Sequence, residues 1–580
     1  MSAYLQNETL KPDTSVPMSQ PRRRSSDIRA RGEPFTWALG GALGVGCLMI
    51  VGFLLMVFWN GVNTFVPRPI AVVTLTDGTV TAGEATRSEL YRVPDDAVAG
   101  LPEAARAEIA AADGFAARTL YRVGNYDLYN EDFRWVSAYE VSGEAFPPDM
   151  VLVERLEWGP FIGRVAAITV DGVTTRPVSV RDPAFVAAHA AARERWQRIR
   201  EIERRDIGKI NHRLEQDRLD LRRIELTEGR DSAAYAELAA RQAAAAAPLQ
   251  QQYAALSDQA QELRVVNERQ TVTLAEIGGR EKIVPLEEIV RIYPANDLGF
   301  GERVAIYLSR WAEFLTDEPR EANTEGGVMP AIFGTFAMTL LMVVAVAPFG
   351  VITALYLREY ATQGRLVSFV RISVNNLAGV PSIVYGVFGL GFFAYVLGGS
   401  IDQLFYPERL PNPTFGTGGL LWSSLTLALL TVPVVIVATE EALSAVPRSM
   451  REGSLACGAS KWQTIKYIVL PRALPGIMTG IILAMARGAG EVAPLMLVGV
   501  VKLAPELPID GFFPFVHLER SFMHLGFHIY DVGFQSRNSE AGKPMVFVTT
   551  LLLIGLIFAM NVTAIVVRNR LKKKFVGSQF

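Results

Sequence analysis

The sequence predicts a polytopic α-helical membrane protein with six transmembrane helices and a large extracytoplasmic α+β insertion between the first and the second. Three observations predict this fold. Half of the 580 residues are hydrophobic. Residues 326–570 are mostly apolar, whereas residues 66–325 are rich in Arg, Glu, Asp and Gln. A basic segment precedes the first apolar run, and another follows the last.

Six apolar runs are long enough to cross a membrane. Lipid offers no hydrogen bonds to the backbone, so a spanning helix needs roughly 20 apolar residues. The first run has no charged residue between Glu33 and Arg68, and its apolar core is too long for a secretory signal peptide. The predicted spans are residues 35–65, 330–357, 374–397, 419–439, 474–500 and 545–567.

The positions of Lys and Arg predict which side each loop faces, because cytoplasmic loops carry an excess of these residues near span ends. Five arginines lie between residues 22 and 31, and five basic residues lie between residues 568 and 574. Basic residues also cluster in the loops at 358–373 and 440–473. Both termini and these two loops are therefore predicted to be cytoplasmic, and residues 66–325 to lie outside.

The polar insertion is predicted to combine a small β domain with a helical hairpin. Strand-like runs occur at 70–75 and 151–153, and Asp77-Gly78 is a turn signal. Heptad spacing predicts a helix over 183–225, and a second helix carries an apolar stripe from Leu249 to Leu263. We interpret these stripes as the seam of the hairpin, with a docking surface as the alternative. The expected domains are a basic N-terminus (1–34), the first transmembrane helix (35–65), the α+β domain (66–325) and a membrane domain with five helices (326–580).

Composition argues against several kinds of partner and chemistry. A formal net charge of −2 does not favour nucleic acid as a partner. The two cysteines, Cys47 and Cys457, predict neither a disulfide framework nor a zinc site. His517, His524 and His528 have the spacing of one helical face, but the aromatic residues around them favour an interfacial helix over a metal site. We therefore predict no metal, no cofactor and no catalytic residue.

The loop between the fourth and fifth spans carries the most specific pattern in the chain. Residues 451–471 read REGSLACGASKWQTIKYIVLP. This segment resembles the loop of permease subunits of ATP-binding-cassette importers, which forms a short coupling helix seated in a groove of the ATPase subunit. A basic amphipathic loop lying on the inner leaflet is the alternative. The positions that match at the family spacing are Glu452, Gly458, Ile468, Leu470 and Pro471.

The resemblance also bears on where ATP is hydrolysed. The chain lacks the Gly-x-x-x-x-Gly-Lys-Ser/Thr pattern that cradles nucleotide phosphates. We therefore expect a non-catalytic subunit whose ATP is hydrolysed by a partner. A membrane-bound sensor is a candidate of a different class, but a sensor would normally carry a large cytoplasmic output domain, for which this sequence gives no signal.

Two further segments resemble one branch of these permeases. Residues 376–386 (NLAGVPSIVYG) and 486–494 (ARGAGEVAP) look like the third-span and fifth-span signatures of the PstA family of phosphate permeases. The resemblance covers about residues 327–567, and residues 311–323 resemble part of an extension found in a subset of that family. It implies import of inorganic phosphate across the bacterial inner membrane, with sulfate or molybdate as the alternative. The implied partners are a PstC-like permease, a dimer of PstB-like ATPase subunits, a PstS-like phosphate-binding protein and the lipid bilayer.

Two charged residues lie inside the predicted fifth span, where a charge is costly and usually faces a bundle interior or a water-filled path. Arg487 and Glu491 are four residues apart, so on one helix they can pair. A structural ion pair is one interpretation. The other is a substrate pathway in which Arg487 presents a guanidinium to an anion and Glu491 loosens its grip. Pro381 and Pro494 are expected to kink the third and fifth spans.

Overall fold

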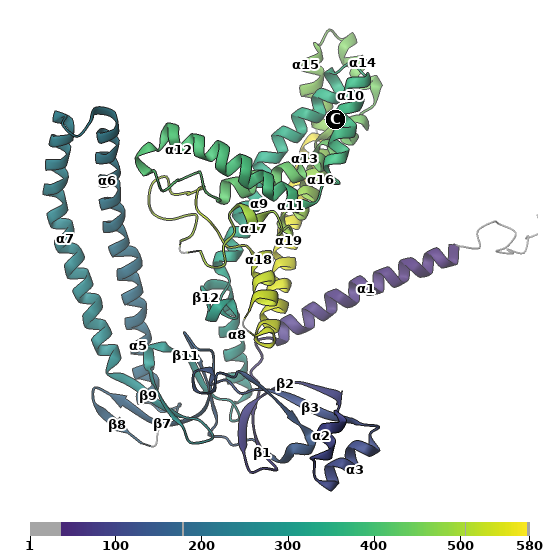
Figure 1. Cartoon of the computed structure of the whole chain (residues 1–580). Coiled ribbons are helices and arrows are strands. Elements are labelled where there is room, and N and C mark those ends of the chain that lie inside the picture. Colours follow the sequence, from purple (N-terminus) through teal and green to yellow (C-terminus); the bar gives the residue numbers. More distant parts are fainter. Residues whose placement is uncertain (1–35, 177–178, 505, 537, 577–580) are drawn as a thin grey trace, which may run out of the picture. The chain divides into compact units, whose positions relative to one another are not determined.

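The computed structural model describes residues 36–176, 179–504, 506–536 and 538–576. The basic N-terminus predicted to be cytoplasmic, residues 1–34, lies outside the described residues. The chain divides into two units: the first ends at Val57 and the second begins at Phe58. The first unit contains most of helix α1 (Thr36–Asn63), a run of apolar residues whose side chains are largely exposed. The second unit holds the remaining elements (Figure 1).

Two antiparallel sheets form the β part of the region between residues 66 and 325. In the first sheet the strand order is β4-β3-β2-β1-β5. The turn between β1 and β2 is the predicted one, since Gly78 has a φ of +85° and the Asp77 carboxylate accepts the Thr79 backbone N–H. Three short helices, α2 (Asp95–Ala99), α3 (Glu103–Ala111) and α4 (Tyr126–Tyr129), lie between the strands in sequence. The strands of this sheet are β1 (Ile70–Leu75), β2 (Val80–Arg92), β3 (Phe115–Arg122), β4 (Phe133–Ser137) and β5 (Val141–Ala145).

The second sheet has the order β10-β9-β7-β6-β11, with β8 paired to β7. Its fully buried side chains include Phe161, Leu274 and Ile289, which pack against Phe185 at the start of the helical hairpin. The sheet therefore supplies the base from which the hairpin extends. Its strands are β6 (Val151–Arg155), β7 (Phe161–Val170), β8 (Val173–Thr175), β9 (Gln270–Ala275), β10 (Glu281–Pro285) and β11 (Ile289–Pro294).

The helical hairpin is inserted between β8 and β9. Its first arm consists of α5 (Pro183–Glu201), which continues through a π-helical segment into α6 (Gly208–Glu228). Its second arm is α7 (Ala233–Glu268), whose N-terminus is capped by the Ser232 hydroxyl. The arms lie side by side (Figure 1), and near their base Ile199, Ile202 and Ala260 form a buried seam. At the far end Gly229, with a φ of +88°, ends α6.

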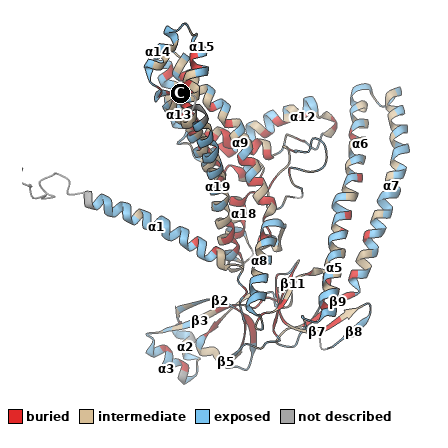
Figure 2. Cartoon of the chain, turned by 180° about the vertical axis from the view of Figure 1, so that it is seen from behind, coloured by how far each residue is buried: buried red, intermediate tan, exposed pale blue. Residues whose placement is uncertain are grey.

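Within the described residues, six helices are long and apolar enough to cross a membrane, as the sequence predicted. Helix α13 is the most enclosed, with 67% of its most apolar window buried, whereas that share is 0% in α19. In Figure 2 the ribbon of α1 is coloured almost entirely as exposed, whereas buried segments occur in the span helices of the second unit. The candidate spans are Ala38–Asn63, Met329–Tyr360, Ser382–Phe405, Leu420–Ser444, Lys461–Ala489 and Ser539–Lys573.

Shorter elements connect the candidate spans. Helix α8 (Phe300–Thr316) and the two-stranded pair β12 (Pro319–Arg320) and β13 (Glu325–Gly326) precede the second span. The span helices of the second unit are α9 (Met329–Leu355), α11 (Ser382–Phe388) continuing to α12 (Gly399–Phe405), α13 (Leu420–Ser444), α16 (Leu470–Ala489) and α19 (Ser539–Val576). The connecting helices are α10 (Arg365–Leu377), α14 (Arg448–Ala456), α17 (Leu495–Val498) and α18 (Leu525–Tyr530), and α15 (Lys461–Thr464) begins the fifth candidate span.

Two span boundaries differ from the sequence prediction for the same reason. Pro381 was expected to kink the third span, but helix α10 ends before it and α11 starts directly after it. Pro494 was expected to kink the fifth span, but α16 ends at Ala489 and Pro494 precedes the short helix α17. A proline favours an extended residue before it and has no N–H for a preceding carbonyl, so each acts as a helix boundary.

Small residues allow the spans of the second unit to pack closely. A Cβ added at Gly476 or Gly480 of α16 would lie 2.6 Å and 2.4 Å from the Cβ atoms of Ala442 and Ala438 of α13. Both pairs are four residues apart, so two small faces meet across the helix pair. A Cβ at Gly488 would lie 2.3 Å from the Met342 sulfur of α9. Any larger side chain at these glycines would push the helices apart.

Candidate functional site

The segment that carries the most specific sequence pattern forms two short helices. Helix α14 ends at Ala456, and Gly458 follows with a φ of +84°, a conformation that L residues with side chains disfavour. The Ser460 hydroxyl oxygen then accepts a hydrogen bond from the Gln463 backbone N–H. In return, the Gln463 side-chain oxygen accepts one from the Ser460 backbone N–H. The chain therefore turns sharply at Gly458, and a capping box starts α15.

An arginine within this segment joins it to the ends of two spans. Arg451 donates to the backbone carbonyls of Leu443 and Val446, each at 2.7 Å, and to the Glu359 carboxylate at 3.0 Å. The last carbonyls of a helix have no partner within it, so Arg451 supplies both hydrogen bonds and favourable charge to the end of α13. The sequence pattern alone gives Arg451 no role, although this residue directly precedes Glu452.

Some of the matching residues in the segment 451–471 are exposed, and the others are half-buried near the start of α16. Glu452 and Gly458 are exposed, and Ile468, Leu470 and Pro471 are half-buried where α16 begins. Three large apolar side chains beside them are also exposed: Leu455, Trp462 and Tyr467. The segment therefore presents an apolar surface with one carboxylate while its base is packed against the spans. Aromatic side chains on such a surface are typical anchors of protein interfaces.

The predicted pair inside the fifth span is present but sits at the end of the helix. Arg487 lies in the last turn of α16, and Glu491 lies beyond the helix end at Ala489, so the two are not on one continuous helix face. Arg487 Nε is 3.9 Å from Glu491 Oε1, and the side chains are 37% and 23% exposed. This distance allows an ion pair but exceeds a hydrogen bond. The guanidinium thus keeps most of its donors available.

The surroundings of this pair are closely packed on one side. Gly488 faces Met342 of α9, and Gly386 of α11 meets the backbone of Pro494, 2.7 Å from a Cβ placed there. Gly490 has only the Arg487 carbonyl near it, so its role is not close helix packing. Helix α11 therefore meets the start of α17, which directly follows the charged pair in the sequence.

The single helical face predicted for three histidines is not formed. His517 lies in a loop, where its ring nitrogens are 3.0 Å from Asp510 and 3.1 Å from Glu519. His524 precedes α18, where its Nδ1 accepts the Gly526 N–H, and only His528 lies within that helix. Burial lowers the pKa of His528 to about 4, which keeps it neutral near pH 7. Among the described residues no group of three or more His, Cys, Asp or Glu is placed to hold a metal ion.

The hairpin and the segment before the second span contact the loops between the later spans. The Asn323 side chain donates to the buried carboxylate of Asp531 at 2.9 Å, and Lys502 lies 3.2 Å from the same carboxylate. Arg223 of α6 donates to Glu408 at 2.7 Å. These partners are far apart in the sequence and follow no local pattern, so sequence reasoning did not find them. A further contact of this kind stacks His212 on Phe512.

Comparison with known proteins concerns the C-terminal region. Residues 346–573 match the family described as binding-protein-dependent transport system inner membrane component. "Probable ABC transporter permease protein YqgH" of Bacillus subtilis (strain 168) is 37% identical over 204 residues, which is 34% of this chain and 62% of the relative. "Phosphate transport system permease protein PstA 1" of Mycobacterium tuberculosis (strain ATCC 25618 / H37Rv) is 42% identical over 175 residues, 30% of this chain and 51% of the relative.

One solved chain of the MetNI methionine ABC transporter is 19% identical, with a TM-score of 0.31, over 42% of this chain and 94% of that one. The chain thus spans only about half to six-tenths of the length of the two curated relatives it matches. Within that span, the C-terminal membrane region of this chain is similar to the inner membrane components of binding-protein-dependent transport systems, and its predicted resemblance to the PstA permeases is confirmed.

Proposed function

We propose that this chain is the membrane-spanning permease subunit of an ATP-binding-cassette importer that carries inorganic phosphate across the bacterial inner membrane. The observation that carries the proposal is the family match over residues 346–573, together with relatives named as phosphate transport permeases. On this proposal the chain performs no covalent chemistry. A partner ATPase supplies the energy, and a PstC-like permease and a PstS-like binding protein complete the importer.

The two short helices α14 and α15 are the proposed docking surface for the ATPase subunit. Glu452, Leu455 and Trp462 are exposed there, and a mixed apolar and charged surface suits a partner groove. Arg451 holds the docking surface to the ends of α13 and α9 through the Leu443 carbonyl and the Glu359 carboxylate. A displacement of the surface by the ATPase would therefore be passed to two spans through one side chain.

Arg487 is the proposed anion contact on the substrate pathway. Its guanidinium is only partly exposed and makes a single long ion pair with Glu491. A guanidinium can bind two oxygens of a phosphate at once. Glu491 competes for the guanidinium, which keeps the anion weakly held, as transport requires. The alternative role, a purely structural pair, predicts a different result in the variant experiment below.

The proposed topology follows the distribution of Lys and Arg. Both termini and the loop that contains α14 and α15 lie in the cytoplasm, and residues 66–325 form an extracytoplasmic domain. Residues 35–65 are then the first transmembrane helix, and residues 326–580 the permease domain. The contacts of Arg223 with Glu408 and of Asn323 with Asp531 support this arrangement, because they join loops proposed to lie on the same side.

Uptake of radiolabelled phosphate tests the proposal. Cells that lack this chain should lose high-affinity phosphate uptake and regain it when the full chain is restored. An excess of unlabelled sulfate or molybdate should leave phosphate uptake unchanged. If either oxyanion competes as well as phosphate does, the permease serves another substrate. Unchanged phosphate uptake in cells without the chain would refute the proposal.

A double variant separates the two roles of the charged pair. Arg487→Gln with Glu491→Gln removes both charges at nearly constant volume, so a structural pair would be replaced by an amide pair. We expect the variant to fold and assemble but to transport at least about tenfold more slowly, since a charged hydrogen bond contributes roughly 1.5–3 kcal/mol. The matched control is Arg371→Gln with Glu440→Gln, a pair 3.2 Å apart with similar exposure, 33% and 20%. Uptake above about half of wild type in the first variant would assign the pair a structural role.

A further inference from the structure

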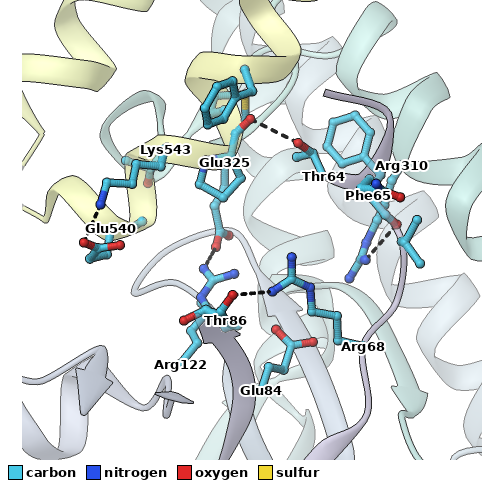
Figure 3. A pocket seen from close by; sticks show the side chains of 18 of the residues that line it. Thr64, Phe65, Arg68, Glu84, Thr86, Arg122, Arg310, Glu325, Glu540 and Lys543 are labelled. Carbon is cyan, nitrogen blue, oxygen red and sulfur yellow. Dashed lines mark hydrogen bonds and ion pairs between the residues drawn. The ribbon is translucent and has the colours of Figure 1, made fainter. Parts of the chain in front are cut away.

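A cavity of about 470 Å³ lies between the first β sheet, the end of α1 and the start of α19. Its lining comes from the end of α1, from strands β2 and β3, and from the start of α19 (Figure 3). None of these residues has a role in the proposed transport. The volume falls within the range typical of sites for small organic ligands and is much larger than a single inorganic anion requires.

Most of the charges that line the cavity are already paired. Arg122 donates to Glu325 at 2.6 Å, and Lys543 donates to Glu540 at 2.5 Å. Arg310 pairs with Glu154 in the same way. These pairs leave little net charge for an incoming ligand. Recognition of a charged ligand must therefore come from charged side chains of the lining that have no such partner.

Two groups of opposite charge remain without an ionic partner. Arg68 donates only to the backbone carbonyls of Ala85 and Thr86, at 3.2 Å and 3.5 Å. Glu84 projects from β2 into the same cavity and is 8% exposed. Among the described residues neither side chain has an oppositely charged group within 4.0 Å, and Glu84 accepts no hydrogen bond. Burial raises the pKa of Glu84, with the charges of Arg122, Arg310 and Arg68 opposing this shift.

An unpaired buried carboxylate is costly, and a cation brought to it would offset that cost. Arg68 would equally gain from an anion, and the Nε of the nearby Arg122 is a buried donor without a partner. The cavity therefore offers one anionic and one cationic subsite at the same time. A zwitterion satisfies both, whereas a lone phosphate ion would leave Glu84 unpaired.

The remaining lining indicates that the zwitterion is amphiphilic. Asn60 and Asn63 lie at the end of the first candidate span, and Met545 and Phe547 lie near the start of the last one, so the cavity is lined by the ends of two candidate spans. Phe65, Met545 and Phe547 supply an apolar side to a cavity whose other side is charged. Phospholipid head groups occupy this depth, with their esters and chains next to apolar side chains.

We propose that this cavity binds the head group of a zwitterionic phospholipid that carries a phosphodiester and an ammonium group. The phosphodiester contacts Arg68 and the free Nε of Arg122, the ammonium contacts Glu84, and the glycerol end lies against Phe65 and Phe547. The bound lipid joins the extracytoplasmic domain to the membrane surface. This inference concerns lipid retention and stands independently of the transported substrate.

Native mass spectrometry of the full chain, released from detergent, tests the site. The chain is titrated separately with phosphatidylethanolamine, phosphatidylglycerol and inorganic phosphate. We expect wild type to retain phosphatidylethanolamine about tenfold better than phosphatidylglycerol, and Arg68→Gln to retain both lipids about tenfold less, as loss of one charged hydrogen bond predicts. Glu84→Gln should abolish the preference for phosphatidylethanolamine while phosphatidylglycerol still binds. This change of preference is a result that a merely structural role for Glu84 would not give.

The control variant is Arg218→Gln, which removes an exposed arginine of the hairpin paired with Glu215 and should leave lipid retention unchanged. If Arg68→Gln does not fold, lipid retention by Arg68→Lys is measured in its place. That retention, together with the wild-type preference between the two lipids, then tests the proposal. Equal retention of both lipids by wild type would overturn the proposal. So would binding of inorganic phosphate that depends on Arg68 with no retained lipid, since the site would then take a free anion. A cavity that holds water only, with no adduct of any probe, would overturn it as well.

Discussion

The two ends of α13 are closed by different kinds of contact. At its start, the free backbone N–H groups of Leu420 and Leu421 donate to the carbonyls of Arg520 and Leu518 in a later loop, at 3.0 Å and 2.8 Å. At its end, the side chain of Arg451 donates to the Leu443 carbonyl and to the Val446 carbonyl just beyond the helix. Every helix leaves such groups at both termini. The start is thus bonded by backbone carbonyls of a distant loop, whereas the end receives a charged side chain from the segment that follows it.

This difference matches what each end has to do. The backbone contacts at the start of α13 belong to a region where the loops also bind the hairpin and Asn323, so that end is enclosed by the chain itself. Beyond the end held by Arg451, Leu455 and Trp462 are exposed on the surface where we propose that the ATPase binds. A long arginine side chain can change its conformation and keep its hydrogen bonds when a helix shifts, whereas direct hydrogen bonds between backbone groups cannot adjust in this way.

The largest effect is expected at the turn of the docking surface. Gly458→Val forces a β-branched residue into a positive φ, which costs roughly 1–2 kcal/mol and adds bulk where the ATPase would seat. We expect phosphate uptake to fall at least about thirtyfold with unchanged protein abundance in the membrane. The matched control is Gly453→Ala, since Gly453 is helical and a Cβ there meets nothing within 4 Å. Normal uptake by a well-expressed Gly458→Val protein would remove the docking role.

The next effect concerns Arg451 itself. Arg451→Gln loses the charged bonds to Glu359 and to two carbonyls, so we expect uptake to fall about tenfold. ATP hydrolysis by the assembled importer should fall less than uptake, because the partner still binds but its motion is passed on poorly. Both rates are measured on reconstituted complexes. Arg448→Gln, an exposed arginine of the same helix, is the control and should stay within about twofold of wild type. Equal losses in the two rates would contradict the idea of a link through Arg451.

The comparison also separates what the sequence could predict from what it could not. Apolar runs predicted six spans because length and hydropathy are local properties. The Asp77-Gly78 pair predicted a turn, since a positive φ favours glycine at the second position, and Gly78 has a φ of +85°. The roles of Arg451 and Asn323 were missed because their partners are reached only in the folded chain: Asn323 and Asp531 are 208 residues apart. The helix ends near Pro381 and Pro494 were not predicted, because the apolar sequence continues across both prolines while the helix is interrupted there.

A smaller effect on transport is expected near the start of α13, from the contacts of Asp531 with Lys502 and Asn323. Asp531→Asn keeps the shape but leaves Lys502 without its ionic partner at 3.2 Å. Lys502 is 40% exposed, so we expect a loss of only about 1–2 kcal/mol and a midpoint of thermal unfolding lowered by roughly 3–6 °C. Uptake at low temperature should change less than threefold. Asp258→Asn, on the exposed face of α7, should leave the midpoint unchanged. A large uptake defect at unchanged stability would mean that the contacts of Asp531 take part in transport.

The smallest effect concerns the contact between the hairpin and the loop after the third span. Arg223 is 56% exposed and Glu408 only 2%, so water and salt screen the arginine and weaken the pair. A double-mutant cycle with Arg223→Gln and Glu408→Gln should give a coupling free energy of at most about 1 kcal/mol, decreasing as NaCl is raised. Uptake in each variant should stay within about twofold of wild type. The opposite outcome is informative: if Arg223→Gln lowered uptake tenfold while thermal stability held, the hairpin would control the loop beside the third span, and the start of α13 would be as mechanically important as its end.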